Sequence, residues 1–456
     1  MLQRYFDEGL AQASFLIACD RTREAAVIDP RRDIEIYVAA ARDRGLALRF
    51  AIETHVHADF VSGARELAAL GVRVVGGPGS ALRYDHQEGA DGDGVQIGDI
   101  ELRFLHTPGH TPEHISILAT EPGQPKRLFT GDTLFVGAVG RPDLLGVEQT
   151  RQLASQLYDS LFDKILALDD ATEVHPGHGA GSLCGAGIGN APHSTIGQER
   201  RFNPMLQHRT RETFMKAVLG DLPETPPYFA RMKRVNQEGA PLRHLGDGFP
   251  AISPLPAADA AAAANAGALL LDVRGADAFC AAHPLGAVNI GYGTKVGYWA
   301  GWVLQPDARI IVVAPGATEA NDTARQLARV GIDHVQGYVD GGFEAWRAAD
   351  LPVARITQMS VAELKTRLAS KDRVAVIDVR TPREWRDGHI AEAAHLPLGD
   401  VTSKLASVPT NVPVATICEA GFRSSLAASL LARAGLVHVV NVTGGMAAYR
   451  ALEATA

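Results

Sequence analysis

The chain has 456 residues, more than one hydrophobic core usually supports, so two or three domains are expected. A net charge of −8 argues against a nucleic-acid or anionic-membrane surface, and four cysteines are too few for a disulfide framework. No apolar run approaches the roughly 18 residues of a membrane span, and the acidic N-terminus is unlike a secretory signal, so we expect a cytoplasmic protein with no membrane partner.

In the first 250 residues, short apolar runs alternate with turn residues, which predicts strands that end in loops. Residues 13–19, 24–30 and 48–55 are such runs. Chemistry-bearing segments follow these and later runs: "THVHAD", "HTPGHTPEH", "FTGDTLF" and "VHPGHGAG". Because strand ends in layered folds often carry functional sites, we expect these loops to converge at one edge.

Six residues of these four loop segments are the candidate metal ligands. They are His55, His57, Asp59, His110, Asp132 and His175. A single histidine in a loop usually caps a helix or bonds a carbonyl, but six such residues in four motifs favour a metal site. Imidazole and carboxylate suit zinc, iron or manganese, whereas copper(I) prefers sulfur. Spacing alone allows any three of the six to be the ligands.

The order of these motifs resembles the metallo-β-lactamase superfamily over about residues 1–250. The resemblance implies a four-layer αββα sandwich with metal at one edge. Hydrolases of this superfamily, such as glyoxalase II, typically extend the first motif to His-x-His-x-Asp-His, and the aspartate and last histidine hold a second metal. Phe60 stands in that last position here, so a dinuclear centre loses a ligand.

The segments "TPGHTPEH" and "FTGDTLFVGAVGRPDL" resemble the persulfide dioxygenase branch of the superfamily. The resemblance implies that His55, His110 and Asp132 bind one Fe(II) per chain. Such a face of two histidines and one carboxylate leaves positions open for substrate sulfur and dioxygen. Zinc is the alternative metal.

The same resemblance gives supporting roles to the other residues. His57, Asp59 and His175 would orient the ligands by hydrogen bonds. Arg141 would pair with a site carboxylate or a substrate, with a surface salt bridge as the equal alternative. Cys184 is either a buried structural residue or a thiol that accepts or shuttles sulfane sulfur.

The rest of the chain contains an internal repeat. Residues 268–279 return as 374–385, about a hundred residues later, which is a usual domain length. Each copy alternates buried strands with helices, which predicts two small α/β domains with mainly parallel sheets. We therefore expect three domains, at 1–250, 255–355 and 357–456.

Cys418 lies between a predicted buried strand and a predicted helix. Backbone N–H groups of the turn, the helix dipole and the charge of Arg423 all favour a thiolate, which suits a nucleophile that carries an anionic adduct. A buried structural cysteine is the alternative. The motif Cys-x-x-Gly-x-Arg, with Gly421, resembles the rhodanese family; phosphatases on this scaffold typically have a loop one residue longer.

The middle unit has Ala314 at the position that corresponds to Cys418, so it cannot carry a persulfide and is interpreted as a degenerate rhodanese unit acting as a scaffold. Its aromatic, glycine-rich stretch, residues 291–302, would pack against a neighbouring domain or subunit, or fill its own core.

The order of the three units resembles persulfide dioxygenase–rhodanese fusions of sulfide detoxification. That implies oxidation by O2 of a low-molecular-weight thiol persulfide, such as glutathione persulfide, to sulfite and thiol, and sulfur transfer with sulfite or thiosulfate through Cys418. The alternative is a glyoxalase II-like zinc or dinuclear thioester hydrolase with an appended sulfurtransferase. A third hypothesis is a sulfur carrier with a structural metal. The family also implies a homo-oligomer, a dimer or tetramer.

Overall fold

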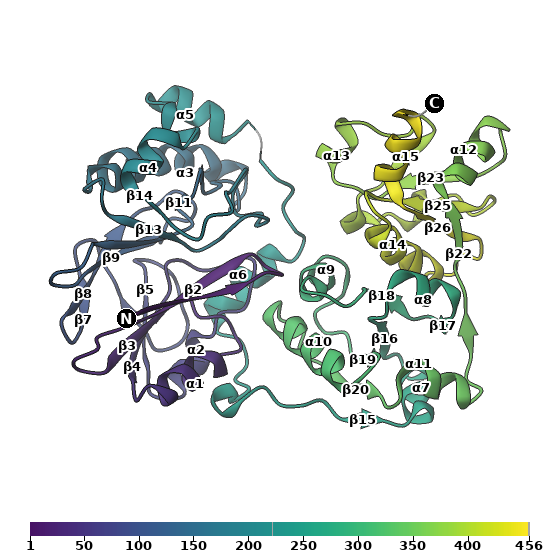
Figure 1. The fold of residues 1–456 in the computed structure, drawn as a ribbon, viewed down its shortest axis with the longest axis horizontal. Helices are drawn as coiled ribbons and strands as arrows, with labels where there is room; N and C mark the ends of the chain where they lie inside the picture. Colours follow the sequence, from purple (N-terminus) through teal and green to yellow (C-terminus); the bar gives the residue numbers. More distant parts are fainter. Residues whose placement is uncertain (221, 455–456) are drawn as a thin grey trace. The chain divides into compact units, whose positions relative to one another are not determined.

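The computed structural model describes residues 1–220 and 222–454, which divide into two units (Figure 1). The first unit holds residues 1–250 with 329–331, and the second lies within 251–328 and 332–456.

Two sheets form the centre of the first unit. The strands of the first sheet, in spatial order, are β1 (Leu2–Asp7), β2 (Gln12–Ala18), β3 (Glu24–Ile28), β4 (Ala47–Ile52), β5 (Arg73–Gly76) and β6 (Gln87–Glu88). Those of the second are β14 (Ser194–Thr195), β13 (Glu173–Pro176), β10 (Arg127–Gly131), β9 (Ile115–Thr120), β8 (Ile100–His106) and β7 (Gly94–Ile97). A hairpin joins β11 (Leu134–Phe135) to β12 (Ala138–Val139).

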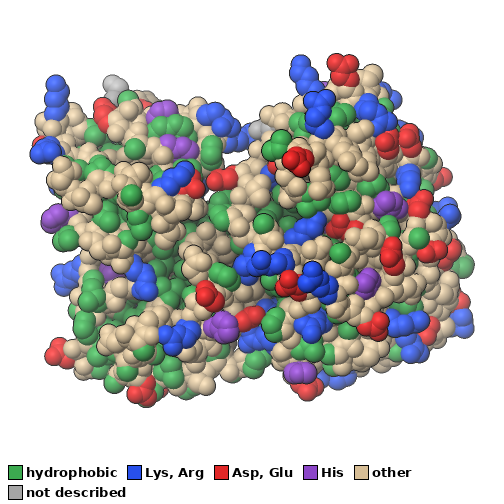
Figure 2. All heavy atoms as spheres, turned by 180° about the vertical axis from the view of Figure 1, so that it is seen from behind, with side chains coloured by type: hydrophobic (Ala, Val, Ile, Leu, Met, Phe, Trp, Pro, Cys, Tyr) green, Lys and Arg blue, Asp and Glu red, His purple; other side chains and the backbone are tan. Residues whose placement is uncertain are grey.

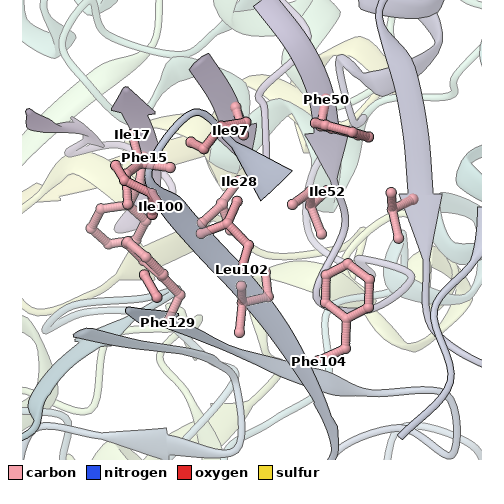
Figure 3. Close-up of a cluster of buried hydrophobic side chains, with 14 of the residues drawn as sticks. Phe15, Ile17, Ile28, Phe50, Ile52, Ile97, Ile100, Leu102, Phe104 and Phe129 are labelled. Atoms are coloured by element: carbon pink, nitrogen blue, oxygen red, sulfur yellow. The ribbon is translucent and has the colours of Figure 1, made fainter. Parts of the chain in front are cut away.

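The main core lies between these sheets, and the pattern of β8 shows why. Ile100, Leu102 and Phe104 are buried, whereas the residues between them are exposed, because successive side chains of a strand point to opposite faces. Across the core, the rings of Phe15 and Phe129 lie 5.0 Å apart (Figure 3).

Helices cover both outer faces. Over the first sheet, α1 (Glu35–Asp43) and α2 (Ala64–Ala68) pack on the side of β2 and β3 that faces away from the core. Over the second lie α3 (Val147–Asp159), α4 (Ile196–Phe202) and α5 (Arg211–Val218), while α6 (Phe229–Glu238) follows later in the chain (Figure 1). The predicted αββα sandwich is therefore confirmed.

The second unit holds two parallel sheets with the same topology. The strands of the first, in spatial order, are β15 (Pro254–Leu255), β20 (Val335–Val339), β19 (Ile310–Val313), β16 (Leu269–Asp272) and β18 (Val288–Asn289). Those of the second are β22 (Thr357–Ser360), β26 (Val439–Thr443), β25 (Val414–Ile417), β23 (Ala375–Asp378) and β24 (Ala393–His395). A short antiparallel pair is made by β17 (His283–Pro284) and β21 (Val353–Ala354).

The helices of this unit lie around the two sheets. They are α7 (Ala257–Asn265), α8 (Ala276–Ala281), α9 (Val296–Val303), α10 (Ala317–Arg329), α11 (Gly342–Ala348), α12 (Val361–Ala369), α13 (Pro382–Arg386), α14 (Phe422–Arg433) and α15 (Gly445–Ala454). The shared strand order confirms that the internal repeat is a repeated α/β fold.

The chain also contains short helical turns of the π and 3₁₀ types. They are Ser160–Lys164 (π) and, as 3₁₀ turns, Ile165–Ala167, Met205–Gln207, Leu245–Asp247, Leu398–Asp400 and Leu405–Ser407.

Buried hydrogen bonds join the two repeats of the second unit. Asn289, at the end of β18, accepts from the hydroxyl of Ser425 at 2.9 Å, and its backbone N–H donates to Ser429 at 3.0 Å. Both serines lie on α14, the helix that begins beside Cys418. Because unpaired buried polar groups are costly, these bonds fix the end of β18 against α14.

The surface is mixed in charge. On the face shown in Figure 2, acidic and basic side chains are interspersed. Within the described residues, no helix has both the length and the apolar character needed to cross a bilayer.

Candidate metal centre and cysteine loop

Three of the predicted residues meet at one edge of the sandwich. His55 follows β4, His110 lies in the loop between β8 and β9, and Asp132 directly follows β10. One ligand atom of each lies within 4.8 Å of those of the other two. Oδ2 of Asp132 is 3.7 Å from Nε2 of His55 and 3.4 Å from Nε2 of His110. All three side chains are buried.

The hydrogen bonds around this group fit a metal ion. In the part of the chain that the structure describes, Nε2 of His55 and Oδ2 of Asp132 are buried and lack a hydrogen-bond partner. Buried polar atoms of this kind are rare unless an ion or water pairs them. The Nδ1–H of His110 donates to the carbonyl of Arg141 at 2.8 Å, which leaves Nε2 as the metal-facing nitrogen.

His114 positions Asp132 through a hydrogen bond to its backbone. Its Nε2 accepts from the backbone N–H of Asp132 at 3.0 Å, and its ring stacks on His55 with centroids 5.1 Å apart. Burial lowers the pKa of His114 to about 3, so the ring stays neutral and can accept this bond. Gly131 has a φ of +46°, and a Cβ there would lie 2.6 Å from Nε2 of His114, so glycine is required.

His57 belongs to a different buried network. Its Nε2 lies 3.1 Å from Asp29 and 3.2 Å from Glu53. Burial opposes charge on the ring, but these carboxylates raise the pKa of His57 well above its usual range. The fully buried ring of Phe60 packs on it at 4.4 Å. Asn236 of α6 donates to the carbonyls of both His57 and Phe60 at 2.8 Å, which holds the loop in place.

The structure brings His178, which sequence reasoning missed, to the position expected for His175. Nδ1 of His178 bonds Asp132 at 2.7 Å, and Nε2 bonds Asp59 at 2.8 Å. Burial opposes charge on His178, but the two carboxylates raise its pKa to about 10.

His175 instead bonds Glu173 at 3.0 Å and packs against Phe15 and Phe129. The two histidines differ in where they lie relative to strand β13. His175 lies inside β13, whereas His178 follows the strand, as the other site residues follow theirs.

Cys184 and Arg141 lie beside the site and are both buried. Cys184 packs against Phe135 and Ala138. Burial, and then the charges of Asp132 and Asp59, raise the pKa of the Cys184 thiol well above its usual range, so the thiol is protonated.

Arg141 does form a salt bridge, with Asp143, but its own side chain is buried and not at the surface. Its guanidinium is buried and binds Asp143 through two bonds of 2.7 Å, and it also donates to the carbonyl of Leu183 and the hydroxyl of Thr225. The contact of Arg141 with the site is its backbone carbonyl, which accepts from His110.

The second site is built at the end of β25. Cys418 is buried, and its sulfur accepts from the backbone N–H of Gly421 at 3.1 Å and lies 3.5 Å from the hydroxyl of Ser424. Gly421 has a φ of +102°, a conformation that favours glycine and lets the loop turn back toward the sulfur.

Arg423 is held by a carboxylate from another element. Its guanidinium forms a two-pronged pair with Glu384 of α13, at 2.7 and 2.6 Å. Burial disfavours charge on Glu384, but the hydrogen bonds and charge of Arg423 lower its pKa to about 2. Arg423 therefore acts on Cys418 electrostatically, through its positive charge.

The cysteine-less repeat contacts the Cys418 loop of the other repeat. Ala314 follows β19 as Cys418 follows β25. The stretch 291–302 contains most of α9, where the ring of Trp299 lies 6.2 Å from that of Phe422 and 6.0 Å from the guanidinium of Arg423. Both alternatives for this stretch are seen, since Trp299 packs against the neighbouring repeat while Val296 and Ala300 are fully buried.

Comparison with known protein families assigns both regions. Residues 8–178 match the metallo-beta-lactamase superfamily. Residues 256–349 and 360–452 each match the rhodanese-like domain.

Curated relatives share parts of the chain. A protein of Mycobacterium tuberculosis described as uncharacterised is 41% identical over 123 residues, 26% of this chain and 47% of that protein, so the chain spans about half its length. The mitochondrial persulfide dioxygenase ETHE1 of Bos taurus is 30% identical, over 48% of this chain and 80% of the relative. The hydroxyacylglutathione hydrolase GloC of Haemophilus influenzae is 30% identical, over 42% and 91%.

A solved structure matches more of the chain. A crystal structure of a metallo-beta-lactamase from Staphylococcus aureus is 34% identical with a TM-score of 0.64, and the match covers 74% of this chain and 98% of that one. This share is larger than residues 1–250 alone supply.

Proposed function

The chain belongs to the metallo-β-lactamase superfamily and carries two rhodanese-like domains, and we propose that it is a bifunctional enzyme that oxidises a thiol persulfide and transfers sulfur through Cys418. The observation that carries the proposal is the open group of His55, His110 and Asp132 in a chain that also holds the Cys418 loop. Persulfide dioxygenase relatives support the sulfur chemistry.

In this proposal His55, His110 and Asp132 hold one Fe(II). When bound, ferrous iron supplies a site for dioxygen and the redox chemistry that zinc lacks. The overall reaction consumes one persulfide, one O2 and one water, and yields one thiol and one sulfite. The terminal sulfur is oxidised and dioxygen is reduced, so no further oxidant is needed.

The surrounding residues give the site its shape and charge. The carbonyl of Arg141 fixes the ring of His110, and His114 fixes the backbone of Asp132. His178 holds Asp132 from the other side by donating its Nδ1–H to Oδ1 of the carboxylate. Phe60 provides an apolar ring where related hydrolases have a ligand, which favours a single metal.

Sulfur transfer follows from the second site. The Cys418 thiolate attacks the terminal sulfur of a persulfide, a new S–S bond forms, the old S–S bond breaks, and the thiol leaves with a proton. Sulfite then attacks the terminal sulfur on Cys418, which releases thiosulfate and restores the thiolate. The N–H of Gly421 stabilises negative charge on the sulfur, since hydrogen bonds to charged groups are the stronger ones.

One experiment tests the proposal. Purified protein is analysed for metal, and oxygen uptake is measured after adding glutathione persulfide. One iron per chain with sulfite formed supports the dioxygenase. Zinc with thioester cleavage and no oxygen uptake would overturn it. Cys418→Ser should abolish thiosulfate formation while oxygen uptake persists; surviving transfer would show that the nucleophile is another residue.

A thioester hydrolase is the second candidate, because hydroxyacylglutathione hydrolases are also among the relatives. It predicts cleavage of S-lactoylglutathione by the zinc-loaded protein. The domain limits at 1–250, 255–355 and 357–456, the cytoplasmic location, the role in sulfide detoxification and the homo-oligomer belong to the proposal.

A further inference from the structure

A groove between the two repeats of the second unit takes no part in either proposed activity. Its volume is about 370 Å³, which falls in the range of sites for small molecules. Leu269, Val288 and Val303 of the cysteine-less repeat and Leu430 of the other repeat give the groove apolar walls.

The groove lies away from the Cys418 loop. Leu430 and Arg433 belong to the last turn of α14, whereas the cysteine loop leads into the first turn of the same helix. Because α14 has 12 residues, its two ends are about 18 Å apart. The groove and the cysteine loop are therefore separate sites.

One arginine from each repeat lines the groove, and the two positive charges are not neutralised by the protein. Arg309, which directly precedes β19, donates to the carbonyl of Ala266, and Arg433 donates to the carbonyl of Gly286 at 2.6 Å. Among the described residues, neither guanidinium pairs with a carboxylate and no acidic side chain lines the groove. Burial lowers the pKa of Arg433, and no acidic neighbour offsets this effect.

We propose that this groove binds a small organic dianion, such as a dicarboxylate with an apolar body, which bridges Arg309 and Arg433. The apolar walls would pack on the body of the ligand, and each guanidinium would hold one carboxylate through two N–H donors. The proposal goes beyond persulfide oxidation and sulfur transfer, and it requires neither.

The charge balance of the groove favours an anion. Val303 and Arg433 are the last residues of α9 and α14, so the carbonyl ends of both helices also face this region. Each helix end carries roughly half a negative charge, against one full positive charge on each arginine. The net potential is positive, and the negative groups of the ligand go to the arginines.

The test is isothermal titration calorimetry of the full chain with 2,6-naphthalenedicarboxylate. We expect one equivalent to bind with a Kd below about 1 mM, and the uncharged dimethyl ester to bind at least about 10-fold more weakly. Arg309→Gln and Arg433→Gln should each weaken binding by roughly 5-fold, and Arg309→Lys, which keeps the charge, should lose less than Arg309→Gln.

Arg367→Gln is the matched control, because Arg367 is an exposed arginine of the same unit that does not line the groove. Thr402→Trp fills the groove without touching either charge and should abolish binding. Circular dichroism checks folding; if a glutamine variant does not fold, Thr402→Trp and the ester decide. The site would be overturned by absence of binding in the parent, by unchanged affinity in any of the three groove variants, by equal binding of the ester, or by equal weakening in Arg367→Gln.

Discussion

The two carboxylate oxygens of Asp132 contact different residues. Oδ2 faces His55 and His110, whereas Oδ1 bonds His178. A change at His178 should therefore be felt at the proposed iron site without removing a ligand from it.

The histidine pair of "HPGHG" allows a matched comparison. We expect His178→Gln to lower metal content or oxygen uptake by roughly 10- to 100-fold, as loss of a residue that orients a ligand typically does. His175→Gln should change both by less than about two-fold, because His175 bonds Glu173 and not a site residue. Equal effects of the two substitutions would contradict this placement of the site.

Glu384 gives a pH-dependent prediction. Its folded pKa lies below its usual value, so the pair with Arg423 stabilises the protein above about pH 4.5 and loses this contribution as the pH falls toward about 2. We expect Glu384→Gln to lower the free energy of unfolding by roughly 1–2 kcal/mol at pH 7, after allowing for partial solvent exposure, and by little near pH 2.

The measurement can be confined to the second unit. The tryptophans of the chain are Trp299, Trp302, Trp346 and Trp385. Denaturation followed by tryptophan fluorescence therefore reports residues 251–456 alone. The control is Glu363→Gln, which breaks the more exposed pair with Arg367 and should cost less than about 0.5 kcal/mol. A pH-independent loss in Glu384→Gln would contradict the assignment.

At the level of elements, the site residues that could be predicted from the sequence are those that directly follow a strand. Strand alternation and the position of each motif after an apolar run were enough to predict that the motif loops meet at one edge, whereas the choice of His55, His110 and Asp132 among the six candidates rested on the family resemblance. The alternation could not choose between His175 and His178, because the end of β13 depends on its pairing with β10. The sequence motifs of the last unit place Glu384 near the entrance of the Cys418 loop, but strand alternation could not predict that Glu384 pairs with Arg423, which lies 39 residues later in the chain.

The contact of α9 with the Cys418 loop gives an element-scale prediction. Trp299→Ala removes an aromatic face near Arg423 and Phe422, and a cation–π contact of this kind is worth about 1 kcal/mol. We expect kcat/KM for sulfur transfer through Cys418 to fall by roughly 5-fold, mainly through KM. Oxygen uptake by the same variant is the internal control and should be unchanged; a loss of both activities would indicate general damage.

At the scale of the whole molecule, the candidate metal centre lies in the first unit and the Cys418 loop in the second. The fold of each could be predicted from sequence because its motifs are local. The grouping of Asp59, His178 and Cys184 could not be predicted, since only the tertiary fold brings these three side chains together.

Metal removal should therefore affect the units differently. Chelation removes the ion that would pair the buried atoms of His55 and Asp132, so the melting temperature of the first unit should fall by roughly 10 °C. Oxygen uptake should be lost, while sulfur transfer through Cys418 and the fluorescence-detected transition should change little. Calorimetry with parallel fluorescence measures both; equal shifts of the two transitions would contradict separate sites.

The bonds of Asn289 with α14 have a consequence for how the chain tolerates mutation. A domain without a nucleophile would ordinarily be free to change its amino-acid sequence. Asn289 and Trp299, however, lie against the helix and loop that present Cys418. Random mutagenesis with selection for sulfur transfer should therefore find residues 287–299 nearly as intolerant as the Cys418 loop itself. Selection would retain the cysteine-less repeat for the shape it gives its neighbour.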